Sequence, residues 1–169
     1  MRVLFAAGTQ FPFPRLDEVV LRVARERPEW SLVYQAGPGV ALAPFKCIEG
    51  LQVQPLFEAE CYQRLFAEAD LVVTHAGMGN ILACLEQGKP FLMMPRLARL
   101  GEHRNDHQWD TAEAIARIYG VHFHEEVESL IRGVLEYDGV APWPLAPGET
   151  IRERRRDFGK KLNAWIRTL

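Results

Sequence analysis

Apolar residues along this chain follow two alternating patterns. Short continuous runs, such as LVVT at 71–74 and FLMM at 91–94, alternate with longer segments whose apolar residues are spaced three or four apart. The segment 15–27 carries apolar residues with this spacing at Leu16, Val19, Val20, Val23 and Ala24. Continuous runs predict buried strands, whereas the wider spacing predicts amphipathic helices.

This alternation extends over most of the chain. Strands are expected at 2–7, 31–35, 51–54, 71–74, 91–94 and 121–123, and helices at 15–27, 58–69, 80–87, 106–119 and 127–137. Strands that are apolar throughout and alternate with helices indicate a parallel sheet covered on both faces. We therefore expect an α/β fold with a doubly wound, Rossmann-like, mostly parallel sheet of about six strands.

Three loops that follow expected strands carry unusual residues: GTQFPFPR at 8–15, HAGMGN at 75–80 and PRLARLGEHRNDHQ at 95–108. Ligands of such sheets bind at the carboxyl ends of the strands. In HAGMGN, Gly77 and Gly79 remove side chains where a strand turns into a helix, so backbone N–H groups can face an anion. A tight turn that needs glycine only for its backbone angles is the alternative, and GTQ leaves the same two interpretations open.

Several familiar sites are missing. Neither glycine loop has the GxGxxG pattern of dinucleotide-binding folds, and the chain has no Walker loop, which disfavours NAD and ATP. A GxSxG elbow and a Ser/His/Asp order are also absent.

The segment GEHRNDHQ at 101–108 concentrates polar side chains directly after a strand. Carboxylate and amide groups at this density suit a ligand with many hydroxyls. A metal site built on His103, Asp106 and His107 is a competing interpretation, although Arg104 would set a cation beside the ion. His122 and His124 are expected to be ordinary strand residues.

Composition favours one globular domain. The chain has 169 residues, 48% of them hydrophobic, and a net charge of −2. No apolar run approaches the length needed to span a bilayer, and the three cysteines show no CxxC pairing. We expect a cytoplasmic protein with reduced cysteines, no metal, no cofactor and no nucleic-acid partner.

The charge is uneven, because residues 149–169 contain seven basic and three acidic residues. Their apolar residues have helical spacing: Ile151, Phe158, Leu162, Trp165, Ile166 and Leu169. We expect an α/β domain at 1–140, a Pro/Gly linker at 141–148 and a basic amphipathic helix at 149–169 that docks on a partner or a membrane. A last helix packed on its own domain is the alternative.

Together the motifs resemble a known family. DLVVTHAGMGNILACLEQGKPFLMMPR, followed by GEHRNDHQWDTA, resembles the C-terminal, nucleotide-sugar-binding half of family 28 glycosyltransferases of the GT-B fold. FAAGTQFPFPRL adds to a likeness with the PssE/EpsF type of small exopolysaccharide glycosyltransferase subunit, which extends from residue 2 to about residue 137.

The resemblance implies an inverting UDP-sugar transferase divided between two chains. This chain would bind the donor, and a membrane-anchored PssD/EpsE-like subunit would bind a polyprenyl-diphosphate-linked sugar acceptor at the inner face of the membrane. The product would be an exopolysaccharide or a capsule. Glucose, galactose and glucuronate are all open as donor sugars, and a non-catalytic nucleotide-sugar-binding or assembly module is the alternative function.

The resemblance also implies where the parts of the donor bind. The diphosphate is expected against Gly8, Thr9 and Gln10 and the loop Gly77, Met78, Gly79 and Asn80. The uracil is expected near Leu56 and Phe57, and the sugar near Asp106 and Gln108.

Charge on the departing UDP is expected to meet Arg96, Arg99 or Arg104. Ala83 stands where several relatives carry the glutamate that holds the ribose, so Glu86, three positions later on the helix, is the candidate substitute. The catalytic base is expected from the partner chain, with His75 and His103 as fallback candidates.

Overall fold

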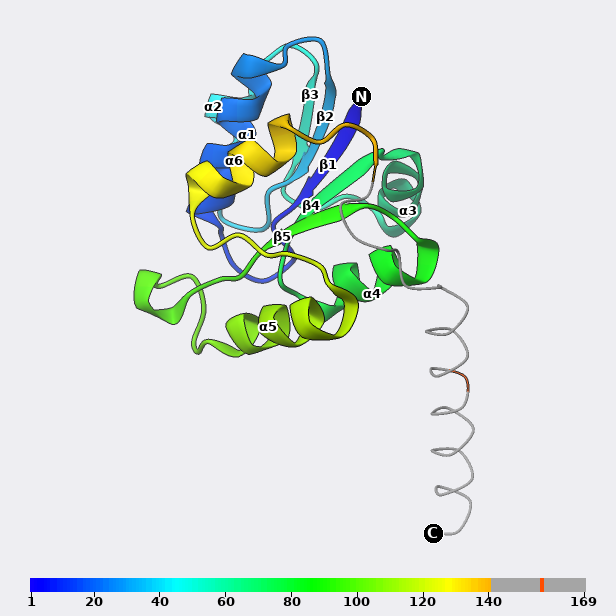
Figure 1. Ribbon diagram of the computed structural model, residues 1–169. Helices are drawn as coiled ribbons and strands as arrows, with labels where there is room; N and C mark the ends of the chain where they lie inside the picture. Colours follow the sequence, from blue (N-terminus) through cyan, green and yellow to red (C-terminus); the bar gives the residue numbers. More distant parts are fainter. Residues whose placement is uncertain (141–155, 157–169) are drawn as a thin grey trace, which may run out of the picture.

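The computed structural model describes residues 1–140 and Arg156 (Figure 1). Its elements are β1 (Arg2–Ala6), α1 (Pro14–Glu26), β2 (Ser31–Gln35), α2 (Ala43–Lys46), β3 (Leu51–Gln54), α3 (Ala59–Glu68), β4 (Leu71–His75), α4 (Met78–Gln87), β5 (Phe91–Met94), the 3-10 helix η1 (Ala98–Leu100), α5 (His107–Tyr119) and α6 (Val127–Leu135). The expected linker at 141–148 lies outside the described residues, as does the expected helix at 149–169 except for Arg156.

The centre of the molecule is a five-stranded sheet in the order β3-β2-β1-β4-β5. All four strand pairings are parallel, so every strand ends at the same edge of the sheet (Figure 1). The chain runs outward from β1 to β3 and then returns to place β4 on the other side of β1. This reversal leaves a crevice between the loops that follow β1 and β4, where doubly wound folds bind ligands.

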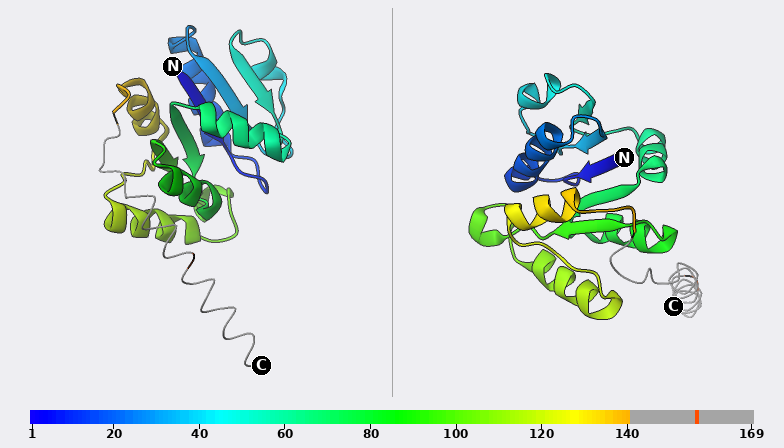
Figure 2. Two further views of the ribbon diagram at one scale, coloured as in Figure 1. Left: turned by 90° about the vertical axis from the view of Figure 1, so that its right-hand side faces the viewer. Right: turned by 45° about the horizontal axis from the view of Figure 1, so that its top comes forward.

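Helices cover both faces of the sheet. α1 and α6 pack together on one face, whereas α3 and α4 lie on the other (Figures 1 and 2). α1 begins with Pro14 at its first position, where the fixed backbone angle of proline suits a helix start. Its buried residues are the five that the sequence pattern predicts: Leu16, Val19, Val20, Val23 and Ala24.

The doubly wound parallel fold is confirmed, and two local expectations are corrected. Residues 121–123 do not form a sixth strand, because only Phe123 pairs with β5, through an isolated bridge to Met93. In the described part of the chain the sheet therefore has five strands. The expected loop after β2 ends in a short helix, α2, which buries Phe45. None of the helices formed by the described residues is long and apolar enough to cross a membrane.

Candidate functional site

A cavity of about 460 Å³ opens at the carboxyl edge of the sheet, in the crevice between the loops that follow β1 and β4. It receives side chains and backbone from the ends of the strands, from α3, from the first turns of α4 and α5, and from the loops that follow β1 and β5. Its lining residues are Ala7, Gly8, Thr9, Gln10, Phe11, Gln35, Phe57, Ala59, Tyr62, His75, Gly77, Gly79, Asn80, Arg96, His103, His107 and Gln108.

The imidazole of His75 lies between the two glycine loops. A Cβ atom on Gly8 would stand 2.7 Å from Cε1 of His75, and one on Gly77 would stand closer still to its Nε2. Gly8 also has a positive φ of 93°, whereas Gly77 has an ordinary φ of −90°. Gly77 is therefore required because a side chain there would collide with His75, and not for its backbone angles. Both glycine loops pack against the His75 imidazole.

His75 is neutral at pH 7. Its Nδ1 lies 3.4 Å from the carbonyl oxygen of Ala6, which can only accept a hydrogen bond, so Nδ1 carries the proton and Nε2 is left as an acceptor. Burial, followed by the nearby charge of Arg96, lowers the pKa of His75 to about 4.

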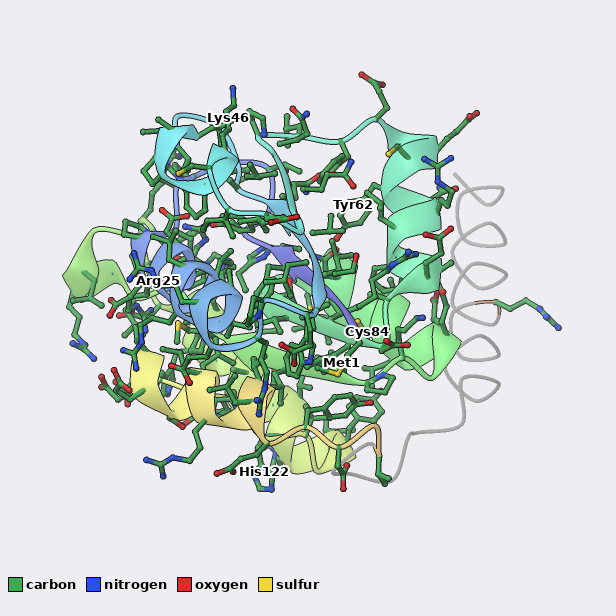
Figure 3. The ribbon with its side chains drawn as sticks, turned by 90° about the horizontal axis from the view of Figure 1, so that it is seen from above. Met1, Arg25, Lys46, Tyr62, Cys84 and His122 are labelled. Atoms are coloured by element: carbon green, nitrogen blue, oxygen red, sulfur yellow. The ribbon has the colours of Figure 1, made fainter. Side chains whose placement is uncertain are left out.

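The side chain of Asn80 is held by two neighbours. Its amide nitrogen donates to the Thr74 hydroxyl at 2.9 Å, and its oxygen accepts from the Tyr62 hydroxyl at 3.0 Å. Tyr62 reaches in from α3 on the side that faces the sheet (Figure 3), and burial raises its pKa. This chain of bonds fixes the start of α4 against β4.

At the β3 end of the cavity, Gln35 and Phe57 form the wall. The buried carboxamide of Gln35 accepts a hydrogen bond from the Phe57 backbone N–H at 3.2 Å. Leu56, which the sequence places with Phe57, is 50% exposed and lies outside the lining.

His103, in the loop before α5, and Gln108, in the first turn of α5, line the cavity, whereas Arg104 and Asp106 do not. Gln108 is buried, and its side-chain oxygen accepts from the Arg96 backbone N–H at 3.1 Å. Asp106 instead accepts from the Ala98 N–H at 2.8 Å. His103 packs edge-on against His107 with ring centroids 4.4 Å apart, and burial followed by the charge of His107 lowers its pKa.

Arg96 is only 2% exposed although it lines the cavity. Its guanidinium donates to backbone carbonyl oxygens and lies over the Phe13 ring, with its carbon 4.5 Å from the ring centroid. Burial lowers its pKa to about 10, so it remains charged at neutral pH. Arg99, by contrast, is 60% exposed and pairs with Glu125 at 2.7 Å.

Two further expected residues do not line the cavity: Met78, which is 46% exposed, and Glu86, which lies on α4. Ala83 packs against the hydrophobic core. No group of His, Cys, Asp and Glu residues in the described part of the chain is arranged to hold a metal ion.

Six residues that line the cavity were not expected from the sequence to bind the donor: Ala7, Phe11, Gln35, Ala59, Tyr62 and His107. Gln35 had a usable signal, because it is the polar end of an otherwise apolar strand at the ligand-binding edge. Tyr62 had none, since an aromatic residue in an amphipathic helix is more often part of the core.

A parallel sheet with a crevice at its point of reversal, bounded by two glycine loops, defines a nucleotide-binding α/β domain. Residues 2–143 match the glycosyltransferase family 28 C-terminal domain. The chain belongs to that family. None of the curated protein sequences compared with the chain matches it.

Solved structures share the fold at low sequence identity. A glycotransferase of kitacinnamycin has a TM-score of 0.62 and 22% identity, over 92% of this chain and 38% of that one. SsfS6 from Streptomyces sp. SF2575, solved with thymidine diphosphate, has a TM-score of 0.50 and 22% identity, over 92% and 41%. ALG13, solved by NMR, has a TM-score of 0.60 and 19% identity, over 89% and 92%. The chain thus spans about two fifths of the two larger enzymes and nearly all of ALG13.

Proposed function

We propose that the chain is the donor-binding catalytic subunit of a two-chain inverting glycosyltransferase of the PssE/EpsF type. It would transfer a hexose or a hexuronic acid from a UDP-sugar to a lipid-linked acceptor for an exopolysaccharide or a capsule. The observation that carries the proposal is the meeting of both glycine loops at His75, on the wall of one cavity, in a chain of this family.

The diphosphate would lie against Gly8, Thr9, Gly77 and Gly79. Gly79 has nothing within 4 Å of the place where a Cβ would stand, so the first turn of α4 is open to the cavity. The positive end of this ten-residue helix attracts an anion. A diphosphate here would also raise the low pKa of His75 and favour proton uptake on its Nε2.

The two ends of the donor would lie on opposite sides of the diphosphate. Phe57 and Gln35 form the side expected for the base, and Gln108 and His103 form the side expected for the sugar. SsfS6, which has the same fold, was solved with a nucleoside diphosphate, thymidine diphosphate. This supports a nucleoside diphosphate as the ligand class here.

In the transfer, the acceptor hydroxyl oxygen forms a bond to the anomeric carbon of the sugar. The bond from that carbon to the diphosphate breaks, UDP leaves with the electron pair, and the hydroxyl proton goes to a base. None of the described residues that line the cavity is an aspartate or a glutamate. This supports a base supplied by the partner chain, with His75 and His103 as the alternatives within this chain.

The share of each similar structure that this chain covers supports a two-chain arrangement. The chain covers 92% of ALG13 but only 38% of the kitacinnamycin glycotransferase, so the same fold occurs both by itself and within a longer chain. The proposed partner is a membrane-anchored PssD/EpsE-like subunit, which brings a polyprenyl-diphosphate-linked sugar and recruits this chain to the inner face of the membrane. Neither a metal nor a cofactor is required.

Calorimetric titration of the purified chain with UDP, UDP-glucose, UDP-galactose, UDP-glucuronate and UDP-N-acetylglucosamine tests the proposal. We expect binding in the presence of a chelator, and sugar transfer only after membranes containing the partner are added. Failure of all five nucleotides to bind would refute the donor site. Turnover without a partner would refute the two-chain arrangement, and binding without turnover in the complete system would favour the non-catalytic module.

A further inference from the structure

Arg96 lies at the junction of the two loops that face each other across the cavity. It comes directly after the end of β5, and its side chain crosses to the loop that follows β1. There its guanidinium donates to the carbonyl oxygens of Ala7 and Phe11, each at 2.6 Å, and to that of Pro12. A fourth bond, at 3.4 Å, reaches the carbonyl of Glu102 in its own loop.

These hydrogen bonds leave few N–H groups of Arg96 available to a ligand. The two terminal nitrogens of a guanidinium carry four N–H groups, and they donate here to four carbonyl oxygens. The group is 2% exposed and lies over the buried ring of Phe13. Arg96 is therefore not arranged as a direct phosphate donor, although it carries a positive charge in the cavity wall.

The bonds instead orient the peptide groups of the loop after β1. In a trans peptide the C=O and the next N–H point in opposite directions. Because the Ala7 carbonyl points at Arg96, the Gly8 N–H points away from it. Gly8 lines the cavity, and its φ of 93° is available to glycine at no steric cost.

Arg96 is also hydrogen-bonded to the side of the cavity formed by Gln108. The backbone N–H of Arg96 donates to the buried side chain of Gln108. Nearby, Arg15 at the start of α1 forms two bonds with Glu102, at 2.8 Å from Nε and 2.5 Å from a terminal nitrogen. Glu102 also accepts from the Leu97 N–H at 3.0 Å. Both arginines thus join the β1 side of the cavity to the loop before α5.

We propose that Arg96 is a positioning residue that locks the loop after β1 to the loop before α5, so that the diphosphate wall and the sugar wall form one rigid unit. The inference rests on the proposed function for what the two walls bind. The rigidity of the loops themselves is independent of that function.

The test compares Arg96→Lys with Arg96→Met. Lysine keeps the charge but cannot reach four carbonyls from one planar group. We expect both variants to lower the NMR order parameters of the Gly8, Thr9 and Gln10 amides from the rigid range, about 0.85. Both should also weaken UDP binding by about tenfold or more, because the loop must be ordered again when the diphosphate binds. Uridine, which lacks the diphosphate, should bind both variants as it binds the wild type.

Arg22→Lys and Arg22→Met are the matched controls, because Arg22 pairs with Glu128 on the surface away from the cavity. They should change neither the order parameters nor UDP binding. If the Arg96 variants do not fold, Glu102→Gln provides the second test, since it weakens the tie to Arg15 without removing bulk. It should lower the order parameters on both sides of the cavity.

Two results would overturn the inference. One is an Arg96→Lys variant that keeps UDP affinity within about threefold of the wild type, which would mean that charge and not geometry matters. The other is unchanged order parameters in the loop after β1. If the wild type binds no UDP, the proposed function fails, and the order parameters still decide whether Arg96 locks the loop.

Discussion

Gly77 and Gly79 are two residues apart, and the structure gives them different roles. A Cβ on Gly77 would collide with His75, whereas a Cβ on Gly79 would meet nothing within 4 Å. The sequence left open whether HAGMGN is a tight turn or an anion site. Gly77 is needed for internal packing, and Gly79 leaves room on the cavity side.

Alanine substitutions separate these roles. Gly77→Ala should destabilise the protein by about 1–3 kcal/mol, because the new methyl group forces the imidazole or the loop to move. Gly79→Ala should leave stability unchanged or raise it by up to about 1 kcal/mol, since alanine favours helices. It should nevertheless weaken UDP binding, because its methyl group occupies the proposed place of the diphosphate. Chemical denaturation and calorimetric titration measure the two effects.

The control is the pair of variants His75→Ala and His75→Ala combined with Gly77→Ala. Without the ring, the alanine at position 77 should cost little, and the double-mutant cycle should show a coupling of the same size as the original penalty. Equal destabilisation with and without the ring would show that Gly77 is needed for a reason other than contact with His75.

The low pKa of His75 predicts a dependence of stability on pH. The folded pKa of about 4 lies below the ordinary value of 6.5, so the unfolded chain binds more protons between these two values. The contribution of the neutral ring to the free energy of unfolding is therefore complete above pH 6.5 and is lost as the pH falls to 4. The loss amounts to about 3 kcal/mol if His75 acts alone.

Urea denaturation between pH 4 and 7 measures this effect by comparing the wild type with His75→Gln. The pKa values of His103 and His124 are also lowered, so only the difference between the two proteins reports on His75. The variant should lose less stability as the pH falls. Parallel curves would contradict the buried neutral state.

At the scale of elements, the periodicity of apolar residues predicted the strands and helices whose formation depends on local burial. The strands at 31–35, 51–54 and 91–94 begin and end where the sequence pattern places them. The segment 121–123 did not become a strand. Val121 is fully buried, but only Phe123 pairs with β5, through an isolated bridge to Met93. The His124 N–H donates to the Met93 carbonyl at 2.9 Å. Burial is readable from sequence, whereas pairing with an edge strand depends on the neighbouring backbone.

The same distinction applies to the site. The sequence identified both glycine loops, because glycine between a strand and a helix serves either a tight turn or a close approach to the backbone. It did not distinguish the arginines, since Arg96 is buried among carbonyls while Arg99 is exposed and paired with Glu125. The partners of a side chain from a distant segment cannot be read from spacing alone.

At the scale of the whole molecule, the described residues 1–140 contain the cavity and a continuous hydrophobic core. The cavity is lined by residues from 7 to 108, and buried hydrophobic residues extend from Val3 to Val134. The family match ends at residue 143. The basic segment at 149–169 follows these boundaries, which makes its role a separate question from donor binding.

A chain that ends at Gly148 answers this question. If the segment 149–169 docks on the partner or the membrane, the shortened chain should unfold as cooperatively as the full chain and should bind UDP within about twofold of it. It should no longer sediment with anionic vesicles or with membranes that contain the partner. Charge reversal at Arg154, Arg155 and Arg156 in the full chain should weaken the same association without changing UDP affinity. Loss of cooperative unfolding in the shortened chain would instead show that the segment packs on its own domain, because removing its apolar side chains would then expose part of the core.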